Sequence, residues 1–226
     1  MTTFNTIGIV GAGAMGRGIA QIAAQAGSTV RLFDMQGAAV EAARTSVGEQ
    51  WDKLQAKGKL DAGKVASFKQ RLVAAAALSD LADCDCVIEA VVERLDVKQT
   101  LFVELEGIVQ PSAVLATNTS SLSVTAIAAA LKRPEKFAGF HFFNPVPLMK
   151  VVEVIAGLKT DPSICTALSA YAKEMGHTPV LAQDTPGFIV NHAGRGYGTE
   201  ALRVVVEGVA DFATIDRILK DQVGFR

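Results

Sequence analysis

A glycine pattern near the N-terminus constrains the fold of this chain more than any other feature. Gly11, Gly13 and Gly16 form the spacing G-x-G-x-x-G directly after an apolar run over residues 6–10, and a helical segment over residues 14–26 follows. In such a strand–turn–helix unit the first glycine permits a tight turn, the second lets the backbone approach a pyrophosphate, and the third lets helix and strand pack closely. The pattern therefore predicts a dinucleotide-binding unit with the phosphates at the helix N-terminus.

An acidic residue at the end of the second expected strand indicates which dinucleotide binds. Asp34 follows the apolar run over residues 29–33, where a carboxylate accepts hydrogen bonds from the adenine ribose and repels the 2′-phosphate of NADP. Arg31, the only nearby cation, lies three residues away and so on the other face of the strand. We therefore expect NAD as the cofactor. Its expected contacts in this unit are Gly11, Gly13, Ala14, Met15, Gly16 and Asp34.

Alternating strand and helix signals predict an α/β fold with a mostly parallel sheet and helices on both faces. The expected strands cover residues 6–10, 29–33, 86–92, 114–117, 137–142, 151–155 and 178–181. The expected helices cover residues 14–26, 38–56, 95–109 and 161–176, with shorter ones from near Asp61 and near Leu122. We expect a Rossmann-type NAD-binding domain with a helical arm after its second strand.

The sequence changes character after Asp184, where strand signals end and only helical sequence follows. We therefore expect an NAD-binding domain over residues 1–183 and the first helices of an all-α C-terminal domain over residues 184–226. One long helix is expected over residues 186–206, with Thr185 as its cap and a proline in its first turn. The roughly forty residues after the boundary are too few for an independent domain.

Composition argues against several partners. The 226 residues carry a net charge of −1, so the chain lacks the electrostatic footprint of a protein that binds nucleic acid or an anionic membrane. No apolar run approaches the roughly 18 residues of a membrane span. The N-terminal residues do not resemble a signal or transit peptide, and we expect a cytoplasmic protein. The three cysteines include one isolated C-x-C pair, so we expect reduced thiols and no metal site.

His141 ends one expected strand and Glu153 lies within the next, and their spacing places them opposite each other. The link is too short for the crossover of a dozen or more residues that parallel pairing requires, so the strands are antiparallel. Pro147 is the midpoint, and in a symmetric hairpin the two Cβ atoms lie about 5 Å apart. A carboxylate there fixes the histidine tautomer and suits a general base that takes a proton from an alcohol. A histidine paired with a surface glutamate without catalytic purpose fits the spacing equally well.

The segment T-N-T-S-S over residues 117–121 follows another expected strand. Loops at the carboxyl ends of strands are where α/β sheets bind ligands. Ser121 is also a good N-cap for the helix expected from Leu122, which is a purely structural role. That role leaves Ser120 to face a ligand.

Five segments carry a resemblance to a known family. In order they are G-A-G-A-M-G, V-I-E-A-V-V-E, T-N-T-S-S-L, F-A-G-F-H-F-F-N-P-V-P-L-M-K-V-V-E-V and D-T-P-G-F-I-V-N. Over essentially its whole length the chain resembles the short-chain L-3-hydroxyacyl-CoA dehydrogenase family, and the last two segments are highly characteristic. The resemblance implies oxidation of a (3S)-3-hydroxyacyl-CoA to a 3-ketoacyl-CoA with NAD, in fatty-acid or aromatic-acid degradation. It favours the functional interpretation of His141.

The resemblance also implies roles for individual residues. His141 matches the catalytic base and Glu153 the residue that orients it. Ser120 matches a serine that hydrogen-bonds the substrate 3-oxygen, and Asn191 matches an active-site asparagine on the first helix of the second domain. The residues matched near the nicotinamide and its ribose are Glu93, Lys98 and Asn144. A solvated pair at a helix start also fits Glu93 and Lys98, and a turn-shaping role also fits Asn144.

Recognition of the CoA moiety is matched less fully. Lys57 lies where the family has a lysine on the CoA phosphates, and an ordinary surface lysine fits the position equally well. Gln50 stands where some members use a serine for CoA. Family members continue beyond residues 224–226 with helices that complete the second domain and much of a dimer interface. We therefore expect a homodimer once that domain is complete, and an exposed apolar patch on this chain.

Two other functions fit parts of the sequence. A non-catalytic NAD-binding relative would keep the glycine pattern, but it would have no need of the four polar residues matched to catalysis. A β-hydroxyacid dehydrogenase with a lysine base needs a lysine on the helix after the boundary, and none lies between Asp184 and Lys220. The acyl group stays open, since 3-hydroxybutyryl-CoA and the dicarboxylic 3-hydroxyadipyl-CoA both fit.

Overall fold

Within residues 3–225, which the computed structural model describes, eight strands form one sheet. The chain divides into a first unit that extends to Pro186 and a second that begins at Gly187, three residues after the boundary expected from the sequence. The strands, all in the first unit, are β1 (Thr6–Val10), β2 (Thr29–Phe33), β3 (Leu72–Ala74), β4 (Cys86–Glu89), β5 (Val114–Thr117), β6 (Phe137–Phe142), β7 (Val151–Ala156) and β8 (Thr178–Gln183).

The order of the strands creates a switch point beside β1. Across the sheet the order is β3-β2-β1-β4-β5-β6-β7-β8, and of these strands only β6 and β7 pair antiparallel. The expected mostly parallel sheet is therefore confirmed. Strands β2 and β4 lie on opposite sides of β1, and the carboxyl ends of the parallel strands from β2 to β6 meet at one edge. In such sheets the crevice outside this edge, where the winding reverses, is where ligands bind.

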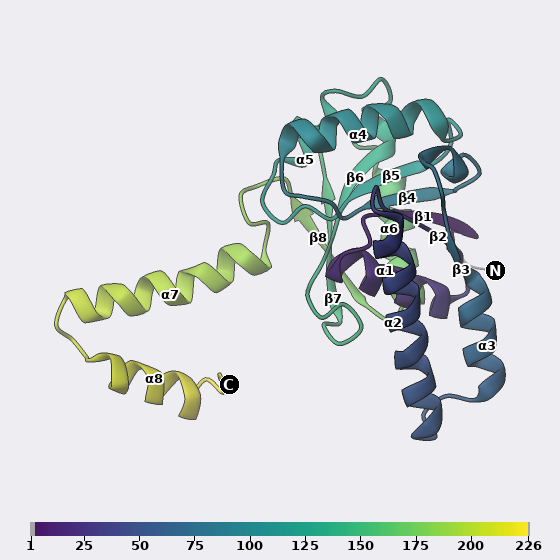
Figure 1. Ribbon diagram of the computed structural model, residues 1–226. Helices are drawn as coiled ribbons and strands as arrows, with labels where there is room; N and C mark the ends of the chain where they lie inside the picture. Colours follow the sequence, from purple (N-terminus) through teal and green to yellow (C-terminus); the bar gives the residue numbers. More distant parts are fainter. Residues whose placement is uncertain (1–2, 226) are drawn as a thin grey trace. The chain divides into compact units, whose positions relative to one another are not determined.

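Helices cover both faces of the sheet (Figure 1). Helices α1 (Ala14–Ala26) and α6 (Pro162–Glu174) lie on one face, and α4 (Leu95–Ile108) with α5 (Val124–Ala128) lies on the other. Short 3-10 turns, η1 (Leu78–Leu81) and η2 (Pro134–Lys136), complete the connections.

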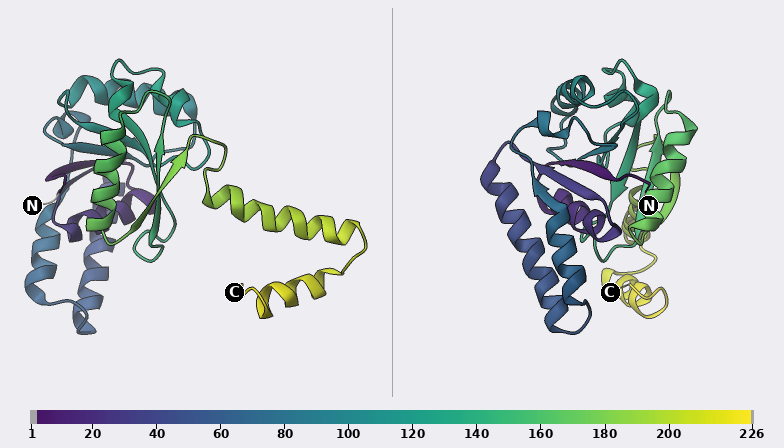
Figure 2. Two further views of the ribbon diagram at one scale, coloured as in Figure 1. Left: turned by 180° about the vertical axis from the view of Figure 1, so that it is seen from behind. Right: turned by 90° about the vertical axis from the view of Figure 1, so that its right-hand side faces the viewer.

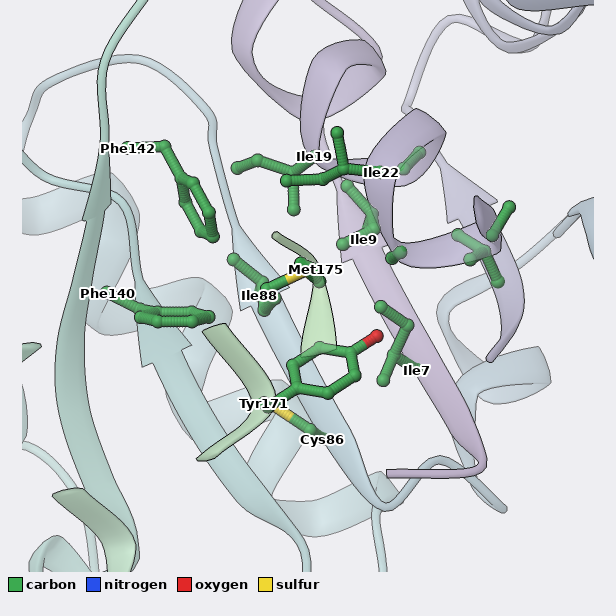
Figure 3. Packing of buried hydrophobic residues seen from close by; sticks show 14 of the residues in the cluster. Ile7, Ile9, Ile19, Ile22, Cys86, Ile88, Phe140, Phe142, Tyr171 and Met175 are labelled. Atoms are coloured by element: carbon green, nitrogen blue, oxygen red, sulfur yellow. The ribbon is translucent and has the colours of Figure 1, made fainter. Parts of the chain in front are cut away.

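The main core lies between the sheet and the pair of helices α1 and α6. Figure 3 shows isoleucine and phenylalanine side chains of β1, β4 and β6 pointing toward residues of these two helices. The labelled residues are Ile7, Ile9, Ile19, Ile22, Cys86, Ile88, Phe140, Phe142, Tyr171 and Met175. Tyr171 is buried, and its hydroxyl lies 2.8 Å from Ser28 Oγ, so the one polar atom it takes into the core is satisfied.

Two helices form the expected arm after β2. Helix α2 (Gly37–Ala56) and helix α3 (Ala62–Arg71) lie side by side and project from the sheet (Figure 2). Trp51 is fully buried between them, with its ring 5.6 Å from that of Phe68. Asp61 begins α3, because its carboxylate accepts a hydrogen bond from Lys64 N at 2.8 Å. The helical arm predicted from the sequence is confirmed.

Two expected boundaries in the first unit are wrong, and one strand was not expected, for local reasons. Strand β4 ends at Glu89 and not at residue 92, because Val91 N donates to the Glu89 side chain and leaves the ladder. Helix α5 begins at Val124, and its N-cap is Ser123, whose Oγ accepts from Ala126 N at 3.1 Å. Ser121 therefore does not cap this helix. The three-residue strand β3 was not expected, since so short a run gives no periodic signal.

Asp184, in the segment after β8, supports the start of α5. Its carboxylate accepts hydrogen bonds from Ser123 Oγ at 2.8 Å, Val124 N at 2.9 Å and Thr125 N at 2.7 Å. Burial acts to raise the pKa of Asp184, but these hydrogen bonds outweigh it, and the pKa lies below its usual value. Asp184 thus belongs to the first unit by its contacts.

The second unit consists of α7 (Val190–Val206) and α8 (Phe212–Asp221). Helix α7 does not begin at Pro186 with Thr185 as cap, as expected. Gly187 and Phe188 have φ values of +78° and +49°, which a right-handed helix cannot contain, so residues 186–189 form a turn. No helix within residues 3–225 is long and apolar enough to cross a membrane.

Candidate active site

The glycine loop has the close approaches that the sequence pattern predicts. Gly11 has φ +105°, and a β-carbon there would lie 2.5 Å from the carbonyl oxygen of Ala90. A β-carbon on Gly16 would lie 1.8 Å from the carbonyl oxygen of Gly11, so neither site accepts a side chain. A β-carbon on Gly13 would meet no atom within 4 Å, which leaves room in front of the loop.

The N-terminus of α1 faces that room without a side-chain cap. Gly13 is its N-cap residue, and no side chain bonds to the free backbone N–H groups of its first turn. Gly13 and Ala14 are exposed, and Met15 is half-buried. An exposed, uncapped helix N-terminus behind a glycine loop suits a pyrophosphate, so these residues fit a dinucleotide.

Asp34 connects the glycine loop to the end of β2. Its Oδ2 accepts from Ala12 N at 2.8 Å, and its Oδ1 accepts from Gln36 N at 2.9 Å. Arg31 is turned away and forms an ion pair with Asp83 at 2.6 Å. The negative charge of Asp34 beside the glycine loop is therefore not neutralised by Arg31 of the same strand. A carboxylate in this position favours NAD over NADP.

A cleft of about 320 Å³ opens at the same edge of the sheet. Its walls come from the start of α1 and from the residues that follow β4, β5 and β6. The lining residues are Met15, Ala90, Val91, Glu93, Asn118, Ser120, His141, Phe142, Phe143 and Asn144. Of the residues predicted from the sequence, the structure thus brings Met15, Glu93, Ser120, His141 and Asn144 together.

The expected pairing of His141 and Glu153 is confirmed. The two residues are directly opposite each other in the antiparallel register of β6 and β7. His141 Nδ1 lies 2.7 Å from Glu153 Oε2, and both side chains are buried. A carboxylate on Nδ1 holds a proton there and leaves Nε2 as the basic nitrogen, which is the arrangement of a general base.

Glu93 holds the loop that carries Ser120. Its Oε1 accepts from Thr119 Oγ1 at 2.6 Å, from Ser120 N at 2.8 Å and from Ser121 N at 3.2 Å. Burial acts to raise the pKa of Glu93, but the hydrogen bonds of Thr119 and Ser120 and the charge of Lys98 outweigh it, so the pKa is lowered. Glu93 is therefore an anion that positions the serine loop.

Lys98 is buried and paired, which rules out the alternative of a solvated lysine at the helix start. Its side chain is 1% exposed, and its Nζ contacts Glu89 Oε1 and, at 3.3 Å, Glu93 Oε2. Glu89, the last residue of β4, is 0% exposed and was not identified from the sequence. Its other oxygen accepts from Thr117 Oγ1 at 2.7 Å. The only available signal was an acidic residue at the end of an apolar strand.

Two asparagines line the cleft in different ways. Asn118, which sequence reasoning did not single out, accepts from Phe142 N at 2.8 Å through Oδ1 and so fixes the end of β6. Asn144 follows β6 and precedes Pro145 in the turn that leads to β7. Its position fits both the turn-shaping role and the cofactor contact.

The predicted substrate-binding residues Lys57 and Asn191 are not part of the cleft lining. Lys57 is exposed at the tip of the arm, where α2 ends. Gln50 is exposed on the same helix. Asn191 lies in the first turn of α7, in the second unit. Among residues 3–225, no group of three His, Cys, Asp or Glu side chains is placed to hold a metal ion.

The shared edge of the sheet defines the class of protein. A glycine loop shaped for a pyrophosphate and a histidine–carboxylate pair open onto the same crevice, and a dinucleotide that crosses it reaches the pair. The fold and the glycine loop are those of a dinucleotide-binding Rossmann domain. Its family follows from comparison with known proteins.

The chain belongs to the 3-hydroxyacyl-CoA dehydrogenase family. Residues 6–185 match the family model described as "3-hydroxyacyl-CoA dehydrogenase, NAD binding domain", and residues 187–226 match "3-hydroxyacyl-CoA dehydrogenase, C-terminal domain". The resemblance stated from the sequence motifs is confirmed, and the cofactor of the matched domain is NAD.

Individual relatives agree with this assignment. A 3-hydroxyadipyl-CoA dehydrogenase of Escherichia coli is 42% identical over 225 residues, which is 100% of this chain and 47% of that protein. A probable 3-hydroxybutyryl-CoA dehydrogenase of Deinococcus radiodurans is 42% identical over 94% of this chain and 76% of its own length. The crystal structure of a Ralstonia eutropha (S)-3-hydroxybutyryl-CoA dehydrogenase superimposes with a TM-score of 0.93 at 39% identity, covering 98% of this chain and 78% of that one. The chain thus spans about half to three quarters of the length of these relatives.

Proposed function

We propose that the protein oxidises a (3S)-3-hydroxyacyl-CoA to the 3-ketoacyl-CoA with NAD, as part of fatty-acid or aromatic-acid degradation. The observation that carries this proposal is the His141–Glu153 pair at 2.7 Å, beside the cleft that begins at the glycine loop. An alcohol dehydrogenase requires a base that removes the alcohol proton and a nicotinamide-dinucleotide site next to that base. The names of the relatives supply the acyl-CoA part of the proposal.

In this mechanism His141 takes the proton of the 3-hydroxyl on Nε2. Glu153 keeps the opposite ring nitrogen protonated and stabilises the imidazolium that results. The Ser120 hydroxyl donates a hydrogen bond to the substrate 3-oxygen, and Glu93 holds the loop that presents it. Asn191, in the second unit, would hold a substrate oxygen. Bound NAD supplies the acceptor for the hydride that leaves C3.

The first unit holds the cofactor in this proposal. The pyrophosphate would contact the N–H groups at Gly13, Ala14 and Met15, and Asp34 would accept from the adenine ribose hydroxyls. The nicotinamide end would lie beside Glu93 and Asn144, with Lys98 acting through its contact with Glu93. Lys57 would contact the CoA phosphates from the arm.

We also propose that the protein is a cytoplasmic homodimer. The second unit exposes apolar side chains that a single helix cannot bury against itself. The exposed residues include Tyr197, Leu202, Val206, Val209, Phe212, Ile218, Val223 and Phe225. Sedimentation of this chain and of a longer one should show association through this surface, and a monomer at both lengths would contradict the proposal.

Turnover decides between this function and a non-catalytic NAD-binding relative. Reduction of acetoacetyl-CoA by the protein, followed as loss of NADH, is expected for the enzyme. NADH binding without turnover at either length would favour the non-catalytic relative.

The substrate is a separate question, because the relatives differ in the acyl group they are named for. Steady-state rates with 3-hydroxybutyryl-CoA and with 3-hydroxyadipyl-CoA would separate the two. A clear preference in kcat/KM for one of them would identify the acyl group.

A further inference from the structure

The polar residues between β4, β5 and α4 form a buried cluster with uneven charge. Glu89 and Glu93 provide two carboxylates, and Lys98 provides one ammonium group between them. With all three groups ionised, the cluster carries one net negative charge. We will call Glu89, Lys98 and Glu93 the acidic cluster.

The acidic cluster lies against the part of the cleft where the chemistry is proposed. Glu93 lines the cleft, and its Oε1 accepts from the backbone of Ser120. His141 and Ser120 line the same cleft. A hydride can pass from C3 to the nicotinamide only if that ring lies in contact with the carbon whose hydroxyl His141 deprotonates. The proposed reaction therefore brings the nicotinamide into this cleft beside the acidic cluster.

The nicotinamide ring changes charge during the reaction. In NAD⁺ the ring is a cation, and in NADH it is neutral. A buried negative charge attracts the first form and leaves the second nearly unaffected, and low-dielectric surroundings strengthen the attraction. The fully buried Glu89 is screened least, because water does not reach its carboxylate.

We propose that the net negative charge of the acidic cluster favours the oxidised cofactor, and that the buried carboxylate of Glu89 is needed for this charge. Glu89 does not touch the substrate. It also positions Lys98, which in turn contacts the Glu93 carboxylate that holds the Ser120 loop. This inference rests on the proposed function, since that function is what places the nicotinamide in the cleft.

Glu89→Gln separates charge from hydrogen bonding. The glutamine Oε1 can accept from Lys98 and from Val91 N, as Glu89 Oε1 does, and its Nε2 can donate to Thr117 Oγ1. The substitution therefore keeps the contacts and removes the net charge of the cluster.

The test is the ratio of the dissociation constants of NAD⁺ and NADH, each measured by titration without substrate. For Glu89→Gln we expect NAD⁺ to weaken roughly three- to tenfold relative to NADH, the size of a partly screened charge–charge interaction over a few ångströms. Loss of structure alone would weaken both forms equally, so an unchanged ratio would overturn the proposal.

Glu106→Gln is the matched control. Glu106 is also a buried carboxylate, but it lies near the carboxyl end of α4, far along that helix from Lys98, where it accepts from Lys132 N and Arg133 N. Its substitution should leave the ratio unchanged. A shift as large as that of Glu89→Gln would mean that any loss of buried charge produces the effect, and would contradict the assignment to the cluster.

A second variant keeps the proposal testable if Glu89→Gln does not fold. Glu93→Gln removes one charge from the other end of the cluster and should shift the ratio in the same direction. An opposite or absent shift would overturn the proposal. Failure of the proposed function has a different signature, since the chain would then bind both cofactors but would not reduce acetoacetyl-CoA.

Discussion

Glu153 and Glu89 are both fully buried carboxylates beside the cleft, yet they organise their surroundings in different ways. Glu153 contacts the side chain of His141 across one strand pair. Glu89 forms an ion pair with Lys98, which also contacts Glu93, and it accepts a hydrogen bond from Thr117 Oγ1 at the start of the loop that carries Ser120. The first carboxylate orients a reacting group, whereas the second supports a loop and contributes charge. Substitutions should therefore affect chemistry on one side of the cleft and folding or cofactor preference on the other.

The largest effect should come from removing the group that Glu153 orients. His141→Gln should lower kcat about 10²- to 10⁴-fold, which is the usual contribution of a general base. NADH binding, measured by fluorescence titration, should stay near that of the parent protein. A variant that retains most of its kcat would show that the base lies elsewhere in the cleft.

On the other side of the cleft, Lys98→Met should act mainly on folding. It leaves the carboxylate of Glu89 buried without its cation, a change that typically costs about 3–5 kcal/mol of unfolding free energy. Lys69→Met is the control, because Lys69 pairs with Asp52 on the surface, and an exposed pair contributes about 0–1 kcal/mol. Equal losses in urea denaturation of the two variants would contradict the structural role given to the acidic cluster.

Glu153→Gln should have a smaller effect than His141→Gln, because the glutamine oxygen can still accept from Nδ1. Loss of the negative charge removes its support for the imidazolium, and we expect kcat to fall roughly tenfold or more. A pH profile of kcat, measured with NADH binding as control, is the appropriate readout. Parent-like rates at every pH would mean that the pairing has no catalytic role.

A third carboxylate at this edge, Asp34, should give the smallest effect. Asp34→Ala should narrow the preference for NAD over NADP, by roughly three- to tenfold for one partly screened charge. Asp34→Asn is the matched variant, since it removes the charge and keeps an oxygen for Ala12 N or Gln36 N. If NADP already binds the parent as tightly as NAD, the assignment of Asp34 is wrong.

The contrast between Glu153 and Glu89 also explains what the sequence could predict. The His141–Glu153 contact depends on one hairpin, and the position of Pro147 was enough to set its register. The start of α5 was predicted two residues too early because the backbone N–H groups before it bond to side chains outside the helix. Ser120 N donates to Glu93, Leu122 N to Thr119 and Val124 N to Asp184. Glu93 and Asp184 come from distant segments of the chain. The local helix propensity of a segment does not predict hydrogen bonds to such distant residues.

The same limit applies to the acidic cluster and the second unit. Glu93 and Lys98 were identified only by resemblance, and Glu89 was missed because its partners arrive from α4 and β5. The start of α7 was predicted four residues too early. Phe188 has a left-handed backbone, which is uncommon for phenylalanine and cannot be predicted from the residue type. The one contact between elements that was predicted correctly, His141–Glu153, lies within a single hairpin. The contacts of Glu89 and Asp184 join segments far apart in the sequence, and they were not predicted.

The hydrogen bonds of Asp184 have a consequence for the order in which the protein can be assembled. Residues 123–125 leave the ribosome about sixty positions before the carboxylate that satisfies them, as the separations of 59 to 61 residues record. Strand β7 likewise has one unpaired edge until β8 is synthesised and pairs with it. A nascent chain arrested before residue 178 can close the β6–β7 hairpin but leaves β7 as an open edge, which is prone to pair with other chains. Translation must therefore run almost to the end of the first unit before the start of α5 gains its hydrogen bonds to Asp184.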